Sequence, residues 1–265
     1  MSFQKGKPLT QDAFEEASEL LGVEAAKLWA VMEVEAKRCG FLEDRRTVIL
    51  FERHKFHERT GGRFAEHHQI SNPQAGGYGR AGAHQHVRLE EAMALDSEAA
   101  IWSTSWGLGQ VMGFNAERAG FEGQEQMVEL MSASEDAQLL GMVRFILSED
   151  LDKSLRTGNW TGFASRYNGR NYRKNQYDER LRGAHQKFST GPLPDILARE
   201  CQLLLTYLGY DPGPIDGWFG PSSQRALNSF QRSRGVDETD DDNLDEDVYL
   251  LRENAFTQSR AELVA

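Results

Sequence analysis

The chain has 265 residues, 39% of them hydrophobic and 27% charged, which is typical of a globular protein that buries its core in two domains or one large one. Its formal net charge of −11, from 41 acidic and 30 basic residues, argues against sequence-independent binding to nucleic acid or anionic lipid. No apolar run approaches the ~18 residues of a membrane span, and the N-terminal stretch MSFQKGKPLT lacks the apolar region of a secretory signal. We therefore expect no nucleic-acid partner, no membrane partner and no signal peptide.

The spacing of cysteines and histidines does not indicate a metal site. Cys39 and Cys201 lie far apart, and a disulfide between them would have to join what we interpret as separate domains, so we expect free thiols. Four histidines in a polar, glycine-rich segment also lack a cysteine partner and the HExxH spacing of zinc enzymes. They are His67, His68, His84 and His86. We expect these to be solvated loop residues, with no metal and no cofactor.

Two helices are predicted at the start of the chain. The first covers 10–22, with Thr10 as its N-cap and Gly22 at its end. The second follows a tight turn and ends at Cys39–Gly40.

Glu35 continues the apolar face of the second helix. Leu28, Val31, Met32 and Glu35 stand at i, i+3, i+4 and i+7, so the carboxyl lies at the end of an apolar face. Desolvation there disfavours the charged form and raises the pKa, which is what a general acid needs near neutral pH. The alternative is a glutamate just beyond the core, with its carboxyl in water.

A continuous apolar run at 47–51 comes next and ends at a second acid, Glu52. Its residue types fit a buried strand or the first turns of a buried helix equally well. The polar segment 57–86 that follows predicts a long surface excursion, and long loops in compact domains are usually functional.

Helical patterns return at 88–100 and at 122–156, separated by a glycine-rich segment, TSWGLGQVMGFN. The glycines among apolar residues either let the backbone approach a ligand or mark a close contact between helices. A further helix leads into Tyr167-Asn168-Gly169, where the aromatic ring and the amide suit carbohydrate, although Asn168-Gly169 is also a good helix end. The basic stretch 166–187 reads as a nucleic-acid patch or, in a chain this acidic, as one wall of a groove for a polar or anionic ligand.

A change of composition at 188–194 predicts a linker. Beyond it we expect two helices joined by a loop of glycine, proline and aspartate, then an acidic run at 237–247 and a last helix at about 244–256. The predicted domains are therefore 1–190 and 191–265.

The second domain resembles the peptidoglycan-binding type 1 domain, whose signature is a DGxFG-P loop followed by a helix with A-x-x-x-F-Q. The matching residues include Asp216, Gly217, Phe219 and Gln231. The resemblance implies a three-helix module that binds the cell wall, with the acidic run as a departure from the short turn usual in that family.

The first domain resembles the N-acetylmuramidase family of phage endolysins across roughly 10–188, through LWAVMEVEA, GFLEDRRTVILFERHKF, SWGLGQVMGFN and ASRYNGRNY. The resemblance implies a mainly α, lysozyme-like catalytic domain in which Glu35 is the general acid. Two departures are Ala36, where serine is usual, and Asp44 to Thr47, where the family has a glycine-rich D-G-R-P.

The implied reaction is hydrolysis of the β-1,4 bond between N-acetylmuramic acid and N-acetylglucosamine in murein. Glu35 would protonate the glycosidic oxygen, and Glu52 would activate water or stabilise the developing cation, unless it is a buried acid paired with Arg53 or His54. Ser105, Gln110, Tyr167 and Asn168 would line the sugar subsites, unless they are satisfied polar groups at helix ends.

Two other functions stay open. A lytic transglycosylase makes the same cut but closes a 1,6-anhydro ring, and a wall-binding virion protein would not cleave at all. For the endolysin, the resemblance implies peptidoglycan as the partner, a monomer, and synthesis in the host bacterial cytoplasm followed by release to the wall through a holin-type lesion.

Overall fold

The structure, a computed structural model, describes residues 6–35, 39–169, 172–239 and 244–261, and the side chains of the last helix as far as residue 256. The α-helices of this part of the chain are α1 (Gln11–Leu21), α2 (Ala25–Glu35), α3 (Arg53–Arg59), α4 (Ala83–Leu95), α5 (Ser97–Trp102), α6 (Gln124–Ala133), α7 (Glu135–Ser148), α8 (Asp152–Arg156), α9 (Trp160–Tyr167), α10 (Tyr177–Thr190), α11 (Ile196–Tyr207), α12 (Pro221–Arg234) and α13 (Leu244–Ala261). The strands are β1 (Ile49–Phe51), β2 (Thr104–Trp106) and β3 (Val111–Met112). The predicted mainly helical fold is confirmed.

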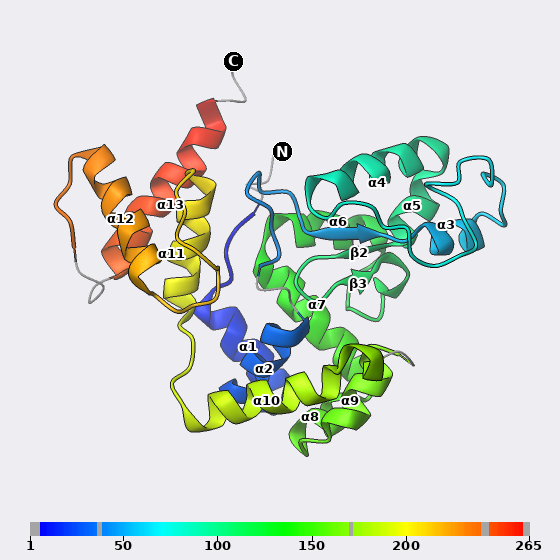
Figure 1. Cartoon of the computed structure of the whole chain (residues 1–265), viewed down its shortest axis with the longest axis horizontal. Coiled ribbons are helices and arrows are strands. Elements are labelled where there is room, and N and C mark those ends of the chain that lie inside the picture. Colours follow the sequence, from blue (N-terminus) through cyan, green and yellow to red (C-terminus); the bar gives the residue numbers. More distant parts are fainter. Residues whose placement is uncertain (1–5, 36–38, 170–171, 240–243, 262–265) are drawn as a thin grey trace.

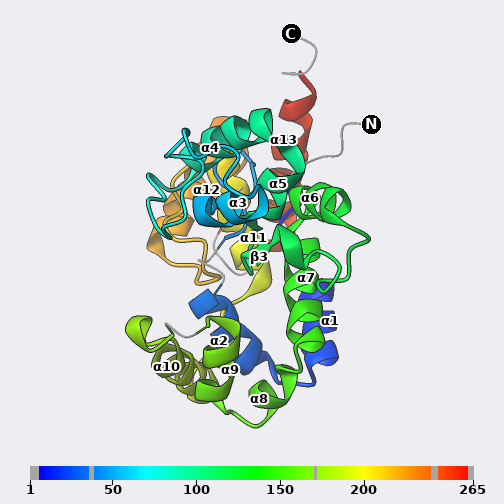
Figure 2. The same cartoon turned by 90° about the vertical axis from the view of Figure 1, so that its right-hand side faces the viewer.

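The elements form three groups (Figure 1). Helices α8, α9 and α10 lie at the bottom, together with α2. The small sheet and helices α3 to α6 lie at the upper right. Helices α11 to α13 lie on the left. Helix α7 runs between the first two groups, and the view turned by 90° shows it beside α1 (Figure 2).

The first two helices follow from local sequence signals. Thr10 Oγ1 accepts a hydrogen bond of 3.2 Å from Ala13 N, and Gly22 ends α1 with a φ of +64°, as the caps predicted. Helix α2 is buried nearly all round rather than on one apolar face, because α10 packs along it on one side and α1 on another. It is helical as far as Glu35, whereas the sequence predicted a helix that ends at Cys39–Gly40. Residues 36–38 lie outside the described residues, and Cys39 is not helical.

The three strands form one antiparallel sheet in the order β1-β2-β3, with Ile49 opposite Trp106 and Ser105 opposite Met112. The apolar run before Glu52 is therefore a strand. Helix α3 starts directly after it, so the surface excursion is shorter than predicted and covers only 60–82.

The glycine-rich segment forms the β2–β3 hairpin, which lies on α7. A Cβ on Gly107 would stand 2.6 Å from the Gln138 side chain, and one on Gly109 would stand 2.6 Å from Met142. The glycines therefore allow the β2–β3 hairpin to pack closely on α7. Their role is close packing within the protein, which is nearer to the predicted helix contact than to the predicted approach to a ligand.

Helices α11 to α13 enclose a second apolar core, separate from that of the larger unit. We call the segment from α11 to α13 the C-terminal unit. Helix α10 continues to Thr190 and buries Phe188, so the predicted linker shortens to 191–195, and α13 runs beyond the predicted end to Ala261.

Both cysteines are free thiols. Within the described ranges, no cluster of three or more potential metal-ligating side chains occurs. None of the helices described is long and apolar enough to cross a membrane.

Candidate active site

Glu35 is the last helical residue of α2 and is half-buried. Its Oε2 accepts a hydrogen bond of 2.8 Å from Asn168 Nδ2. Its Oε1 is buried and has no hydrogen-bond partner among the described residues. The carboxyl therefore has one oxygen held by Asn168 and one buried oxygen whose hydrogen-bonding capacity no described residue uses.

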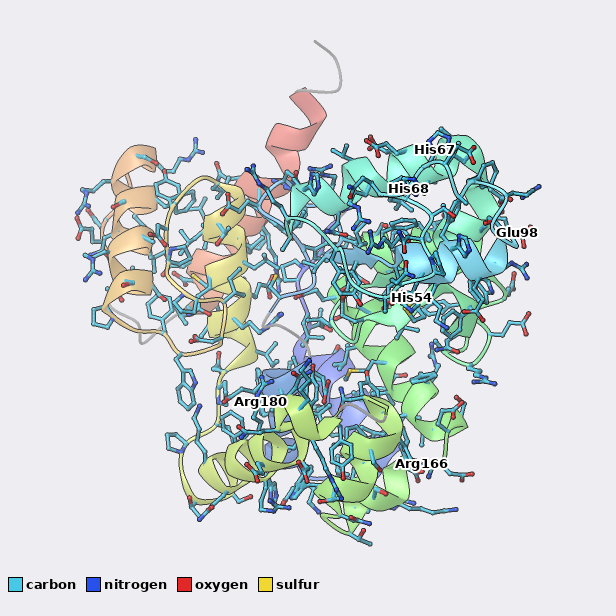
Figure 3. The ribbon with its side chains drawn as sticks, turned by 45° about the vertical axis from the view of Figure 1, so that its right-hand side comes forward. His54, His67, His68, Glu98, Arg166 and Arg180 are labelled. Atoms are coloured by element: carbon cyan, nitrogen blue, oxygen red, sulfur yellow. The ribbon has the colours of Figure 1, made fainter. Side chains whose placement is uncertain are left out.

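Burial raises the pKa of Glu35 to about 7, against 4.5 for an ordinary glutamate. The hydrogen bond from Asn168 and the positive charge of Arg180 on α10 favour the ionised form, but they do not overcome the desolvation. Figure 3 shows Arg180 in the same lower group of helices as Arg166 of α9. A carboxyl with this pKa is partly protonated at neutral pH, so it can donate a proton to a leaving group.

Helices α9 and α10 bring the other groups to Glu35. Helix α10 packs along α2, and α9 packs on α10. At the end of α9 the Tyr167 ring stacks on Phe163 with centroids 5.2 Å apart, and its hydroxyl donates a 3.0 Å hydrogen bond to the carbonyl of Gly109. The Y-N-G segment therefore contacts both Glu35 and the G-L-G-Q turn. The sequence motifs that contain Glu35, Gln110 and Tyr167 thus meet at one place.

Asn168 has an unsatisfied atom as well. Its Oδ1 is buried and has no partner among the residues described, while its Nδ2 is used on Glu35. This oxygen is an acceptor that no described N–H or O–H group uses.

Ser105 and Gln110 have their partners inside the protein. Gln110 Oε1 accepts from Ser105 Oγ at 3.0 Å, and its Nε2 donates to the carbonyls of Gly107 at 2.8 Å and Val48 at 3.3 Å. Gln110 also has a φ of +47°, which these bonds hold in the left-handed region. These two side chains fix the shape of the turn.

Glu52 follows the last residue of β1 and directly precedes α3. Its carboxylate lies 3.2 Å from His54 Nδ1, and its backbone N–H donates to Ser103 O at 3.0 Å. Burial raises the pKa of Glu52, although His54 and Lys55 oppose that change. Figure 3 shows His54 in the upper group with the sheet. No hydrogen bond or ion pair joins Glu52 to the Glu35 cluster within the described ranges.

In the C-terminal unit, Asp216 and Gly217 are held by Gln202 of α11. Gln202 Oε1 accepts from both of their backbone N–H groups, at 3.0 and 2.9 Å, and its Nε2 donates to Trp218 O at 3.0 Å. Phe219 packs on the second core. The buried side-chain amide of Gln202 therefore holds the DGWFG loop in place.

Gln231 is fully buried. Its Nε2 donates to Thr239 Oγ1 at 2.8 Å and to Asp247 Oδ1 at 2.7 Å, so it fastens α12 to the start of α13. The acidic run therefore contributes a buried structural carboxylate.

The DGWFG loop faces the larger unit. A small cavity between the units is lined by both of them, and Trp218 packs against the first core. Glu33 and Lys187, which form an ion pair of 3.0 Å, line it together with Asp216.

Sequence reasoning missed Arg180, Gln202 and a buried ion pair between Glu135 and Arg199. Arg180 stands within the basic stretch 166–187, which was the available signal. Gln202 and the ion pair are polar residues within apolar helical patterns, and nothing local shows what they contact.

The N-acetylmuramidase family model matches residues 24–189, more than half of the chain, and the model of a putative peptidoglycan binding domain matches residues 197–240. Among solved structures, the crystal structure of the Burkholderia AP3 phage endolysin is similar, with 36% identity and a TM-score of 0.65 over 69% of this chain and 72% of that one. The comparison with curated proteins gives no match. The chain therefore belongs to the N-acetylmuramidase family, as a glycoside hydrolase whose catalytic region is followed by a peptidoglycan-binding helical domain.

Proposed function

We propose that the protein hydrolyses the β-1,4 bond between N-acetylmuramic acid and N-acetylglucosamine in murein, with Glu35 as the general acid. One observation carries the proposal: Glu35 has a pKa raised to about 7, one oxygen held by Asn168, and the other without a partner among the residues described. The protonated carboxyl would donate its proton to the glycosidic oxygen as positive charge develops on the sugar ring.

Glu52 is the proposed second carboxylate. Its half-buried position next to His54 supports a role in activating water or stabilising the oxocarbenium-like centre. As the base, Glu52 would take the proton that the water loses, with His54 Nδ1 3.2 Å from its carboxylate.

The substrate acetamide is assigned to Asn168 and Tyr167. Asn168 Oδ1 would accept the acetamide N–H, and the Tyr167 ring supports the wall beside it. Ser105 and Gln110 would shape the same subsite through the turn that they hold, with its backbone in contact with the sugar.

Wall binding is assigned to the domain at 191–265, following a catalytic domain at 1–190. The end of α10 at Thr190 and the two separate cores support this boundary. Within the second domain Asp216, Gly217 and Phe219 form the proposed murein-binding loop, and Gln231 supports it from the core.

The biological role proposed is that of a phage endolysin, supported by the similarity to the Burkholderia AP3 phage endolysin. The protein would act as a monomer on peptidoglycan and not on nucleic acid, consistent with its net charge of −11. It would accumulate in the host cytoplasm and reach the wall after holin-type release.

The test is digestion of purified murein by the wild type, Glu35→Gln and Glu52→Gln, followed by mass spectrometry of the products. We expect reducing-end N-acetylmuramic acid from the wild type and a loss of at least ~100-fold in rate for Glu35→Gln, with murein pull-down retained. Anhydro products would assign the chain to the transglycosylases, and an unchanged rate for Glu35→Gln would remove Glu35 as the acid. Glu33→Gln, two residues earlier on the exposed side of α2, is the matched control and should keep wild-type activity.

A further inference from the structure

The segment 39–48 joins the two elements that carry the proposed catalytic carboxylates. It follows α2, which ends at Glu35, and leads into β1, which ends just before Glu52. Its two ends pair with each other, because Val48 N donates a 2.8 Å hydrogen bond to the carbonyl of Gly40. We call it the connecting loop; residues 36–38, between it and Glu35, lie outside the described residues.

The base of the connecting loop is held by Glu135 of α7. The N–H of Gly40 donates to Glu135 Oε1 at 2.7 Å, and the N–H of Leu9 donates to Oε2 at 3.1 Å. Arg199 of α11 donates to the same carboxylate through Nη1 at 2.6 Å and Nη2 at 2.7 Å. The side chains of Arg199 and Glu135 are only 1% and 0% exposed.

A carboxylate without access to water is stable only with a charged partner and satisfied hydrogen bonds. Here the guanidinium comes from the C-terminal unit, while the carboxylate and the Gly40 N–H belong to the larger one. The wall-binding helix α11 therefore supplies the charge that keeps the base of the loop in place.

The tip of the connecting loop is held by the same unit. Arg45 has a φ of +65°, and its guanidinium lies 4.9 Å from the centroid of the Tyr207 ring and 5.3 Å from that of Phe256. Its Nη2 also donates to the carbonyl of Ala255. These partners lie on α11 and α13, which Figure 1 shows on the left of the molecule.

We propose that Arg199 and Arg45 are positioning residues, through which the C-terminal unit sets the placement of Glu35 and Glu52 and thereby the turnover number. The proposal rests on the proposed function and adds to it that the wall-binding domain contributes to catalysis as well as to attachment. A small misplacement of catalytic groups costs up to ~100-fold in rate, while binding of substrate at other contacts is retained.

The test uses full-length Arg45→Met and Arg199→Met on soluble, peptide-free glycan strands, where attachment to an insoluble wall plays no part. We expect kcat to fall ~10–100-fold in each variant while KM stays within about twofold. Arg199→Lys, which keeps a cation but not the paired geometry, should recover part of the lost kcat. Pull-down on murein should match the wild type.

Arg252→Met is the matched control. Arg252 forms a two-point ion pair with Glu200, including a 2.6 Å hydrogen bond from Nη2, but both residues lie within the C-terminal unit. Its kcat should stay at the wild-type value, which separates the loss of a contact between the units from the loss of an ion pair within the C-terminal unit. A loss equal to that of the other two variants would contradict the proposal.

If Arg45→Met folds and has the wild-type kcat, the proposal is wrong. If Arg199→Met does not fold, the kcat of Arg45→Met is sufficient to test the proposal. The proposed function fails in a different way, namely if the wild type leaves the glycan intact or Glu35→Gln is as active as the wild type. The two failures are therefore distinguishable.

Discussion

Asn168 Nδ2 lies 2.8 Å from Glu35 Oε2, across 133 residues of sequence, and this contact joins the end of α9 to the end of α2. It stabilises the ionised carboxylate, yet the pKa of Glu35 still rises to about 7 because burial outweighs the hydrogen bond. The hydrogen bond from Asn168 therefore lowers the pKa of Glu35, whereas burial in the surrounding core raises it.

The first prediction concerns the pH dependence of turnover. The protonated Glu35 is the active form, so kcat should fall as the pH rises above about 7. In Asn168→Ala the carboxylate loses a hydrogen bond that favours its charged form, so the pKa should increase and the basic limb of the pH profile should move to higher pH. Asn254→Ala, at a site on α13, should leave the limb in place. A limb that moves downward in Asn168→Ala would contradict this assignment.

The second prediction concerns stability. Between the ordinary pKa of 4.5 and about 7 the folded protein keeps a proton on Glu35 that the unfolded chain releases, so this residue lowers the free energy of unfolding as the pH rises through that window. Glu35→Gln cannot ionise and should be more stable than the wild type at pH ~8, by on the order of 2 kcal/mol or ~5 °C. The difference should disappear near pH ~4, where the carboxyl is protonated in both states. Thermal unfolding at the two pH values measures it, and an equal difference at both would show that Glu35 is not desolvated.

The third prediction compares two ion pairs. Burial opposes ionisation of Glu135, but Arg199 and the backbone donors hold the pKa of its carboxyl below the ordinary value. Arg199→Met leaves that charge buried, so it should cost about 3–5 kcal/mol of unfolding free energy. In the Arg252–Glu200 pair the arginine side chain is 49% exposed and the glutamate side chain 5%, so removing Arg252 lets water reach the carboxylate, and Arg252→Met should cost less than Arg199→Met.

The double variant Glu135→Gln/Arg199→Met tests the reason for that difference. It removes the uncompensated charge and keeps an acceptor for Gly40 N, so it should be more stable than Arg199→Met alone in denaturant unfolding. Additive losses would mean that the ion pair is not the source of the cost.

The fourth prediction concerns wall binding. Gly217 has a φ of +79°, and a Cβ there would stand 2.7 Å from the carbonyl oxygen of Asp195. Gly217→Ala should therefore displace the DGWFG loop and weaken pull-down on murein. Gly209 has a φ of +83° with nothing within 4 Å of a Cβ, so Gly209→Ala has similar backbone strain without the collision and should keep binding. If both variants lost murein binding equally, backbone strain alone, and not the collision with Asp195, would explain the loss.

Much of the fold could be predicted from local patterns. Thr10 and Gly22 mark the ends of α1 because caps act within one helical turn, and the DGWFG loop and its flanking helices could be identified from adjacent residues. The apolar run before Glu52 could not be assigned, because a fully buried strand and a buried helix have the same local composition. Pairing with β2, more than fifty residues away, decided it.

By itself the sequence determined two helical units, their order, and an acid at the end of an apolar helix, because periodicity and capping depend on neighbours along the chain. The tertiary structure decided the protonation of Glu35, the internal use of Ser105 and Gln110, and the bond between the two units through Glu135 and Arg199. Desolvation and the pairing of charges are sums over all atoms nearby in space, and those atoms come from helices that no local pattern connects.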